Sequence, residues 1–336
     1  MNTQPSTPSR VHRAFLPRGL LQIYTVAIVS YQLAQASPLR TWWLVQLLAV
    51  LDAWLYLPLV LFICIALYDR RRYTIGLLLL PLVFFAIGYG PRFLPRAVAA
   101  AQPIVRIMTW NILYDNAETA SIVRTIQAQH PDIIAVQEFS TQDSAILGPQ
   151  LRTEYPYQAL APTADGVDGM GIFSRYPIQN SLPPALAPTE CSCQQVDIVL
   201  ATTTMTLFNM HPTIPILQLK RIGALPIPTG FSTHLQDPSF QALLDRVANA
   251  SHSVVVVGDL NTADHLPNYL RLRARLHDAF EAAGWGFGFT YPSSFPLVRL
   301  DYILHDAAWT GEAAWIGEDV ASDHRYLVAD ITYRGN

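Results

Sequence analysis

The stretch Val254-Val255-Val256-Val257-Gly258-Asp259-Leu260-Asn261 decides how this sequence is interpreted. Four consecutive valines are typical of a strand buried on both faces, and the strand ends at the glycine. Positions two apart in an extended chain point to the same side, so Asp259 and Asn261 should emerge together. A carboxylate and an amide at a strand end fit a binding or catalytic site. They also fit an Asx-turn that caps the following helix.

Five other predicted strand ends carry polar side chains of the same kinds. They are Trp110-Asn111, Gln137-Glu138, Asn209-Met210-His211, Arg299-Leu300-Asp301-Tyr302 and Ser322-Asp323-His324. Each alone is typical of a turn, a cap or a satisfied polar group in the core. Six such strand ends are hard to attribute to capping, so together they predict one functional site.

The residues from 104 onward alternate between short β-type runs and helical segments. Strands are predicted at 104–110, 133–137, 170–174, 196–201, 204–210, 254–258, 300–304 and 326–332,. Helices are predicted at 117–129, 236–249 and 266–275,. About 230 residues with this many buried strands indicate one large α/β domain, over 104–334, with two sheets in its centre.

The motifs W-N, Q-E, G-x-x-S-R-Y-P, N-x-H, G-D-x-N, R-x-D-Y and S-D-H follow one another between about residues 104 and 331. In this order they resemble the endonuclease/exonuclease/phosphatase superfamily. That superfamily includes apurinic endonucleases, pancreatic-type deoxyribonuclease, neutral sphingomyelinases and inositol-polyphosphate 5-phosphatases. The resemblance implies a DNase-like, four-layer α-β-β-α sandwich with its site at the sheet edges.

The resemblance also implies a metal site. Glu138 should bind a divalent cation, Asn111 should orient it or share the site, and Asp323 should lie close to the metal. The physical chemistry agrees, because crowded carboxylates repel one another without a cation. Hard cations such as Mg²⁺ or Mn²⁺ prefer oxygen ligands, and we expect one of these two ions.

The remaining roles concern catalysis, and they too are implied by the resemblance. Asp259 should orient and activate the attacking water, and Asn261 should help to hold the phosphate. His324 should contact a phosphoryl oxygen, with Asp301 fixing its ring and raising its pKa. His211 stands where the family has a second phosphate-contacting group. A positioned carboxylate and a histidine held by a carboxylate are suited to proton abstraction and charge stabilisation.

The first hundred residues have a different composition. Hydrophobic residues make up 51% of the whole chain and charged residues only 14%, against about 25% charged in a soluble domain. Residues 1–102 contain nine arginines and two acids, a net charge of +7. Because the whole chain carries −3, the remainder carries −10. The deficit of charge indicates that part of the chain does not face water.

Three uncharged windows predict a transmembrane region of two or three helices over 19–90, between a basic disordered tail at 1–18 and a linker at 91–103. Window 73–91 spans about 30 Å as a helix, and window 53–68 extends back to about Leu48. Window 19–39 contains three glutamines and is either a span or an interfacial helix,. The arginines at 70–72 should be cytoplasmic, which places the catalytic domain on the extracytoplasmic side, periplasmic or extracellular.

Three features are left open by the sequence. Cys191 and Cys193 are either loop thiols or a strained disulfide,. The aromatic, glycine-rich loop at 284–291 either packs on the domain or contacts substrate or lipid. The apolar, proline-rich stretch at 212–236 either borders the site or packs as a surface loop.

Three functions are compatible with these features. The favoured one is a membrane-anchored, metal-dependent phosphodiesterase or phosphomonoesterase for a small or lipid-linked phosphoester, including phospholipid. The alternatives are an extracytoplasmic nuclease and an inactive, membrane-tethered binding module. Nucleic acid is disfavoured as a partner because the domain is acidic and Lys220 is its single lysine,. The sequence does not indicate an oligomeric state.

Overall fold

The computed structural model describes residues 10–69, 72–94, 104–184, 190–318 and 321–335. The chain forms two compact units, Met1–Pro91 and Arg92–Asn336. Residues 1–9 of the predicted tail and 95–103 of the predicted linker lie outside the described residues. Arg92 belongs to the second unit, where its guanidinium is buried and bonds Asp264 at 2.7 Å. This end of the predicted linker is therefore an ordered part of that unit.

The first unit is helical. Its elements are α1 (Arg10–Gln35), η1 (Pro38–Thr41), α2 (Trp43–Val50), η2 (Asp52–Tyr56), α3 (Pro58–Asp69) and α4 (Arg72–Gly88), and η3 (Gly90–Phe93) lies at its boundary with the second unit. Helix α1 begins at Arg10, so the prediction of a disordered tail is wrong for residues 10–18.

The predicted second span is not one straight helix. Among the described residues no single helix is both long and apolar enough to cross a membrane. The segments Trp43–Val50 and Asp52–Tyr68 meet that test only as a pair bent by 80°, and Arg72–Gly88 is apolar but shorter. The break lies at Leu51, whose φ of −110° and ψ of 25° depart from helical values,. Asp52 is buried, and it accepts a hydrogen bond from the Tyr89 hydroxyl at 2.8 Å.

Polar side chains of the helical unit find partners inside it. Gln32 donates to the Tyr56 hydroxyl at 2.8 Å, and Thr25 donates to the Leu77 carbonyl at 3.1 Å. Gln22 also donates to the Tyr73 hydroxyl. The outward-facing side chains are instead mostly apolar, with Ile23, Val26, Leu33, Val60, Leu61, Leu67 and Ile87 all more than 60% exposed. Several polar groups of this unit are therefore paired internally, while most of its exposed side chains are apolar.

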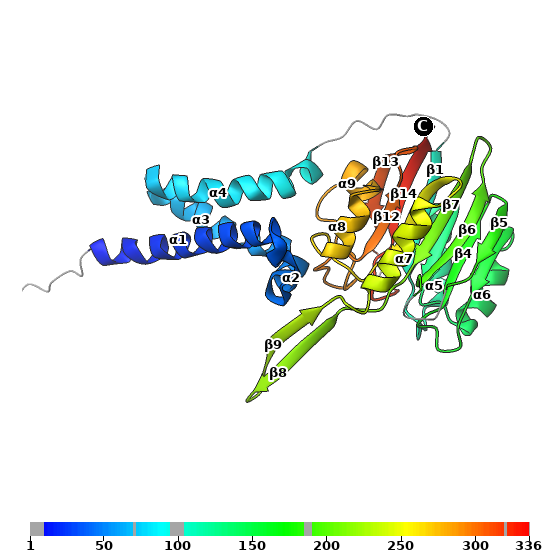
Figure 1. The fold of residues 1–336 in the computed structure, drawn as a ribbon, viewed down its shortest axis with the longest axis horizontal. Helices are drawn as coiled ribbons and strands as arrows, with labels where there is room; N and C mark the ends of the chain where they lie inside the picture. The colour runs from blue at the N-terminus through cyan, green and yellow to red at the C-terminus, as the bar shows by residue number, and fades with distance from the viewer. Residues whose placement is uncertain (1–9, 70–71, 95–103, 185–189, 319–320, 336) are drawn as a thin grey trace, which may run out of the picture. The chain divides into compact units, whose positions relative to one another are not determined.

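The second unit contains two six-stranded mixed sheets (Figure 1). The first has the order β13 (Trp309–Ile316), β14 (Leu327–Tyr333), β1 (Ile104–Asn111), β2 (Ile133–Gln137), β4 (Met170–Ser174), β3 (Tyr157–Ala161). The second has the order β11 (His277–Asp278), β12 (Asp301–His305), β10 (Ser253–Asp259), β7 (Thr204–Met210), β6 (Cys193–Val199), β5 (Ile178–Leu182). A separate hairpin contains β8 (Ile216–Ile222) and β9 (Leu225–Ser232).

Three hydrophobic clusters define the layers. One lies between the two sheets and includes Ile107, Ile133, Leu207, Val255 and Ile303. The second joins the first sheet to α5 (Thr119–Gln129) and α6 (Thr141–Leu151). The third joins the second sheet to α7 (Asp237–Ala248) and α8 (Pro267–Arg273); α9 (Ala279–Ala283) follows β11. Two central sheets flanked by helices are the predicted sandwich.

Three of the sequence motifs contain residues that hold the sandwich together. Gln137 and Asn209 are both fully buried, and Gln137 Nε2 donates across the sheets to Asn209 Oδ1 at 2.7 Å. Arg299 is also buried, and its guanidinium bonds Asp264 at 2.8 Å and Asp278 at 2.7 Å. Because a buried charge is costly without partners, these contacts fix the loops on either side of β12.

The predicted elements are located correctly, with ends that differ by a few residues; β6, for example, covers Cys193–Val199 in place of 196–201. The sequence analysis missed α6, α9, β3, β5, β11 and β13. The hairpin β8–β9 within the stretch 212–236 was not predicted either. The Sγ atoms of Cys191 and Cys193 are joined as a disulfide, and both residues are buried.

Candidate active site

The six predicted strand ends meet at one edge of the sandwich because of strand direction. In the first sheet β1 and β2 are parallel and β14 is antiparallel to β1. Asn111 at the end of β1, Glu138 after β2 and His324 before β14 therefore share an edge. In the second sheet β10 runs parallel to β7 and antiparallel to β12, with Asp259 paired to Asp301. His211 follows β7, so the second sheet brings His211, Asp259 and Asp301 to the same region.

Gly258 allows the end of β10 to approach the end of β7 closely. Its φ is +133°, and a Cβ placed there would lie 2.0 Å from the Met210 carbonyl oxygen. Only glycine fits both the backbone conformation and the space. This close approach of β10 to β7 brings Asp259 next to His211, whose Nε2 is 3.7 Å from Asp259 Oδ2.

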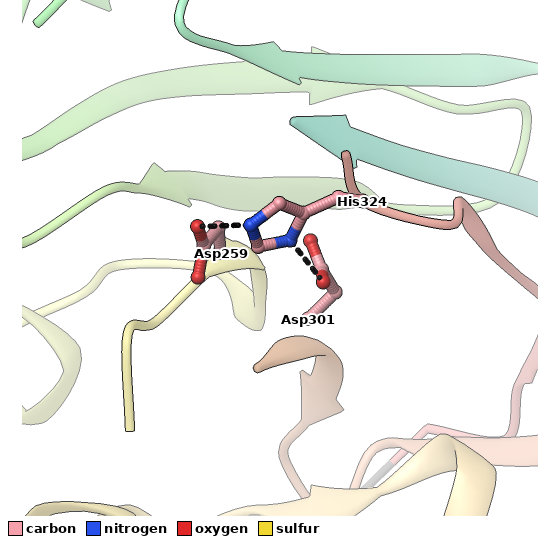
Figure 2. A group of neighbouring side chains, drawn as sticks. All are labelled: Asp259, Asp301 and His324. Carbon is pink, nitrogen blue, oxygen red and sulfur yellow. Dashed lines mark hydrogen bonds and ion pairs between the residues drawn. The ribbon is translucent and has the colours of Figure 1, made fainter. Parts of the chain in front are cut away.

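The ring of His324 lies between two carboxylates (Figure 2). Its Nδ1 is 2.9 Å from Asp301 Oδ2, and its Nε2 is 3.5 Å from Asp259 Oδ2. Burial disfavours the charged ring, but the carboxylates of Asp301 and Asp259 outweigh it and raise the pKa of His324 to about 10. For Asp301, burial disfavours the charged carboxylate and therefore raises its pKa. The ring is therefore held in place as a protonated donor.

Asn111 connects the acids of the two sheets. Its Nδ2 donates to Glu138 Oε1 at 2.9 Å and to Asp259 Oδ2 at 3.1 Å. Glu138 Oε2 accepts from the Tyr114 backbone N–H at 3.1 Å. Glu138 has a φ of +55°, a left-handed conformation that is uncommon for a glutamate and is found at functional sites,. The backbone thus turns at the strand end to direct this carboxylate toward Asp259.

His211 faces the same two acids, with Nε2 3.8 Å from Glu138 Oε1. Its Nδ1 is buried and has no hydrogen-bond partner among the described residues, and the same holds for Asp301 Oδ1. Buried polar atoms are usually paired, so these two atoms are free to bind a water or a ligand group.

Two predicted site residues have a different setting. Asn261 adopts a φ of +46°, and its Nδ2 donates to the Pro212 carbonyl at 3.0 Å. Its amide nitrogen therefore holds the segment after His211, and the phosphate-binding role stays a prediction. Asp323 is only half-buried and accepts a bond from Ser322 Oγ at 3.4 Å. Its charge helps to raise the pKa of His324, while its proximity to a metal stays a prediction.

The donor set fits a divalent cation beside Glu138. Oxygens of Glu138 and Asp259 share Asn111 Nδ2 as a donor and both lie within 3.8 Å of His211 Nε2. Such oxygens are the ligands that Mg²⁺ or Mn²⁺ prefers. Asp259, Asp301 and His324 also have ligand atoms within 4.8 Å of one another. In that group both ring nitrogens of His324 are directed at the two carboxylates.

The sequence analysis assigned no role to two side chains at this edge. The ring of Tyr291 lies 4.8 Å from the ring of His324. Ser322 Oγ donates to the Asn111 carbonyl at 2.7 Å and so connects the S-D-H motif before β14 to the W-N motif at the end of β1. The serine was visible in its motif, whereas Tyr291 lay in the aromatic loop at 284–291. The rest of that loop packs in part, since Phe287 and Phe289 stack at 5.2 Å, while Trp285 is 72% exposed.

Both the sequence and the fold of this chain are similar to those of known proteins. Residues 108–324 match the profile of the Endonuclease/Exonuclease/phosphatase family. A solved endonuclease/exonuclease/phosphatase from Bacteroides vulgatus is 16% identical with a TM-score of 0.53, covering 69% of this chain and 100% of its own. The human Nocturnin catalytic domain with bound sulfate anion is 20% identical, with a TM-score of 0.51 and coverages of 70% and 96%.

A third solved structure, D. rerio TDP2 complexed with a single-strand DNA product, is 17% identical with a TM-score of 0.54, covering 69% of this chain and 100% of its own. At these identities the likenesses show the fold. Among curated proteins, none matches this sequence significantly.

Proposed function

Because this chain belongs to the endonuclease/exonuclease/phosphatase family, whose members hydrolyse phosphoester bonds, we propose that it is a membrane-anchored phosphoesterase for small or lipid-linked substrates. The observation that carries the proposal is the meeting of Glu138, Asp259 and His324 at one edge of the sandwich. Both sheets contribute to this cluster. An inactive binding module would have no need to keep such an acid–base set assembled.

Three residues of the candidate active site have distinct roles in the proposed reaction. Asp259, held by Asn111, accepts a proton from the attacking water,. His324, held by Asp301, donates a hydrogen bond to a phosphoryl oxygen as negative charge develops there,. Glu138, oriented by Asn111 and the Tyr114 N–H, would hold a divalent cation. When bound, this cation would neutralise charge on the phosphoryl group.

The charge of the domain supports the proposed substrate class. Long nucleic acids are bound mainly through arginine and lysine contacts to phosphates. The part of the chain after residue 102 carries −10 and contains one lysine. A bound cation offsets only part of this charge, so a small or lipid-linked phosphoester meets less repulsion than a long polyanion.

A direct competition tests the substrate class. The purified chain is given plasmid DNA, phospholipid vesicles and bis(p-nitrophenyl) phosphate with Mg²⁺ or Mn²⁺, and product release is followed by phosphate assay, absorbance and gel. We expect turnover of the small or lipid phosphoester at enzyme concentrations that leave the plasmid intact. Degradation of plasmid at low nanomolar enzyme without turnover of the others would reject this class.

In that event the second candidate function, an extracytoplasmic nuclease, replaces the first. One observation favours it. The fold is shared with TDP2, which has been captured with a single-strand DNA product. The competition distinguishes the two functions because the substrates differ in charge density and length.

We also propose that the first unit anchors the protein in a membrane and leaves the catalytic unit outside the cytoplasm. The support is the apolar outer surface of the helical unit together with the internal hydrogen bonds of Gln32 and Thr25,. The arginines at 70–72 fit a cytoplasmic turn by the positive-inside rule,. The 17 residues of α4 give a helix of about 25 Å, so it would cross only with its flanking residues included,.

Reporter fusions in a bacterial host check this orientation. Alkaline phosphatase, which needs an oxidising compartment, is expected to be active when fused after Asn336 and inactive when inserted at residues 70–72. The two fusions serve as controls for each other. Phosphatase activity only at residues 70–72 would mean the opposite orientation.

A further inference from the structure

The β8–β9 hairpin exposes apolar side chains that no part of its own unit covers among the described residues. Leu217, Leu219 and Ile222 on β8 are 47%, 55% and 63% exposed, and Leu225 on β9 is 64% exposed. Figure 1 shows the hairpin extending away from the two large sheets. An isolated two-stranded hairpin is only marginally stable in water. Contiguous exposed apolar surface of this kind marks an interaction site.

Apolar residues occupy both faces of the hairpin. Cross-strand partners lie on the same face, and successive residues alternate between faces. The pairs Leu219–Pro228 and Ile222–Leu225 therefore lie on opposite faces. A protein groove would cover one face and leave the other in water. A lipid bilayer surrounds an inserted hairpin on all sides, so it matches this distribution better.

The edge of β9 argues against strand pairing with a second copy. Pro226 and Pro228 have no N–H to donate, and prolines are typical of edges that resist further strands,. Unpaired backbone groups are costly in hydrocarbon, and the prolines remove two such donors. The remaining open edge limits the hairpin to the headgroup boundary and excludes a crossing of the bilayer.

The charge of the hairpin complements anionic headgroups. Lys220 and Arg221 are both exposed and lie next to the turn at Gly223. Residues 198–236 contain no acid, although the domain as a whole carries −10. Long basic side chains beside apolar residues can reach headgroup phosphates while the apolar residues enter the acyl region.

The base of the hairpin is bonded directly to the candidate active site. Gln236, which is fully buried, donates to the Thr213 carbonyl at 2.7 Å and to the Asn261 carbonyl at 2.9 Å. Asn261 in turn donates to the Pro212 carbonyl at 3.0 Å. The segments at both ends of the hairpin are thereby connected to the G-D-x-N loop. A surface that binds the hairpin therefore also keeps the candidate active site close to that surface.

We propose that the β8–β9 hairpin inserts shallowly into an anionic lipid bilayer surface and presents the site to phosphoesters at headgroup level. The insertion stands on the hairpin alone. The presentation to phosphoesters rests on the proposed function.

Depth-dependent quenching tests the insertion. The full chain with Cys64→Ser and Leu219→Cys is labelled with bimane, since Cys191 and Cys193 are joined to each other. It is combined with phosphatidylcholine–phosphatidylglycerol vesicles that contain nitroxide lipid. A matched control carries the label at Leu182→Cys, an exposed leucine at the end of β5.

Strong quenching at 219, little at 182, and loss of most quenching with Lys220→Glu and Arg221→Glu are the expected results. Equal quenching at both positions overturns the proposal. Self-quenching at 219 without lipid, which would show contact between copies of the chain, overturns it as well.

An activity comparison separates the insertion from the chemistry. Leu219→Asn with Ile222→Asn should lower hydrolysis of bilayer phospholipid at least about tenfold, because the apolar contacts with lipid are lost. Hydrolysis of bis(p-nitrophenyl) phosphate should stay unchanged. An equal loss on both substrates contradicts the presentation role. If the unaltered chain hydrolyses neither substrate but quenching at 219 persists, the proposed function fails while the insertion stands.

Discussion

Asp259→Asn is expected to lower kcat by at least about 10²-fold with the fold intact, because a positioned acid–base group is typically worth that much. The substitution preserves shape and the acceptor oxygen that bonds the Asn261 N–H at 2.9 Å. It removes the negative charge that Asn111 and His324 face. The loss should appear mainly in kcat, since the side chain acts on the reacting water, and steady-state kinetics on the preferred substrate measures it.

Asp245→Asn provides the matched control, because Asp245 is an exposed carboxylate on α7. That variant should keep the kcat of the unaltered chain. Circular dichroism and thermal unfolding confirm that both variants are folded. A well-folded Asp259→Asn protein with undiminished kcat would remove Asp259 from the catalytic machinery.

Removal of divalent metal is expected to abolish activity, and added Mg²⁺ or Mn²⁺ should restore it. The acids Glu138 and Asp259 approach each other through shared donors, and the cation supplies the positive charge that a phosphoester needs,. Glu138→Gln should raise the metal concentration needed for half-maximal rate, because the amide lacks the charge that binds the ion. Activity titrated with metal after EDTA treatment measures both effects.

Glu154→Gln is the corresponding control. Glu154 is an exposed glutamate just after the C-terminal end of α6, whereas Ser140 caps the N-terminal end. It should leave the metal titration unchanged. Full turnover in excess chelator, after prolonged dialysis, would contradict the metal assignment.

Much of the sandwich could be predicted from local sequence because its strands are buried on both faces. Val254 to Val257 form a continuous apolar run, and such runs identify strands without any knowledge of partners. The hairpin could not be predicted in this way. Pro226 and Pro228 are ordinarily strand breakers, and its apolar residues show no burial pattern because both faces are exposed,.

Helix α6 was missed for a related reason. Its capping box at Ser140 and Asp143 was a usable signal, but Gly148 and Pro149 near its end obscured the helical period,. The bend between α2 and α3 was missed because uncharged windows report composition and not straightness. The chain breaks at Leu51, and no proline or glycine marks that position in the sequence.

The candidate site was predictable as a set of residue types at strand ends, but its internal bonds were not. Strand direction alone brings Asp259 and Asp301 together, and sheet order was not readable from the sequence. The bond from Gln137 to Asn209 and the ion pairs of Arg299 join residues far apart in the chain. These residues belong to the same motifs as the catalytic candidates, so only the structure separates supporting residues from reacting ones.

Hydrolysis in ¹⁸O-labelled water tests the central claim most directly. The protein and Mg²⁺ or Mn²⁺ are incubated with bis(p-nitrophenyl) phosphate or the preferred phosphoester, and both products are analysed by mass spectrometry. Attack of an activated water on phosphorus predicts one ¹⁸O atom in the phosphate-containing product and none in the alcohol or phenol. Label in the alcohol or phenol, or no hydrolysis of any phosphoester supplied with metal, would contradict the account.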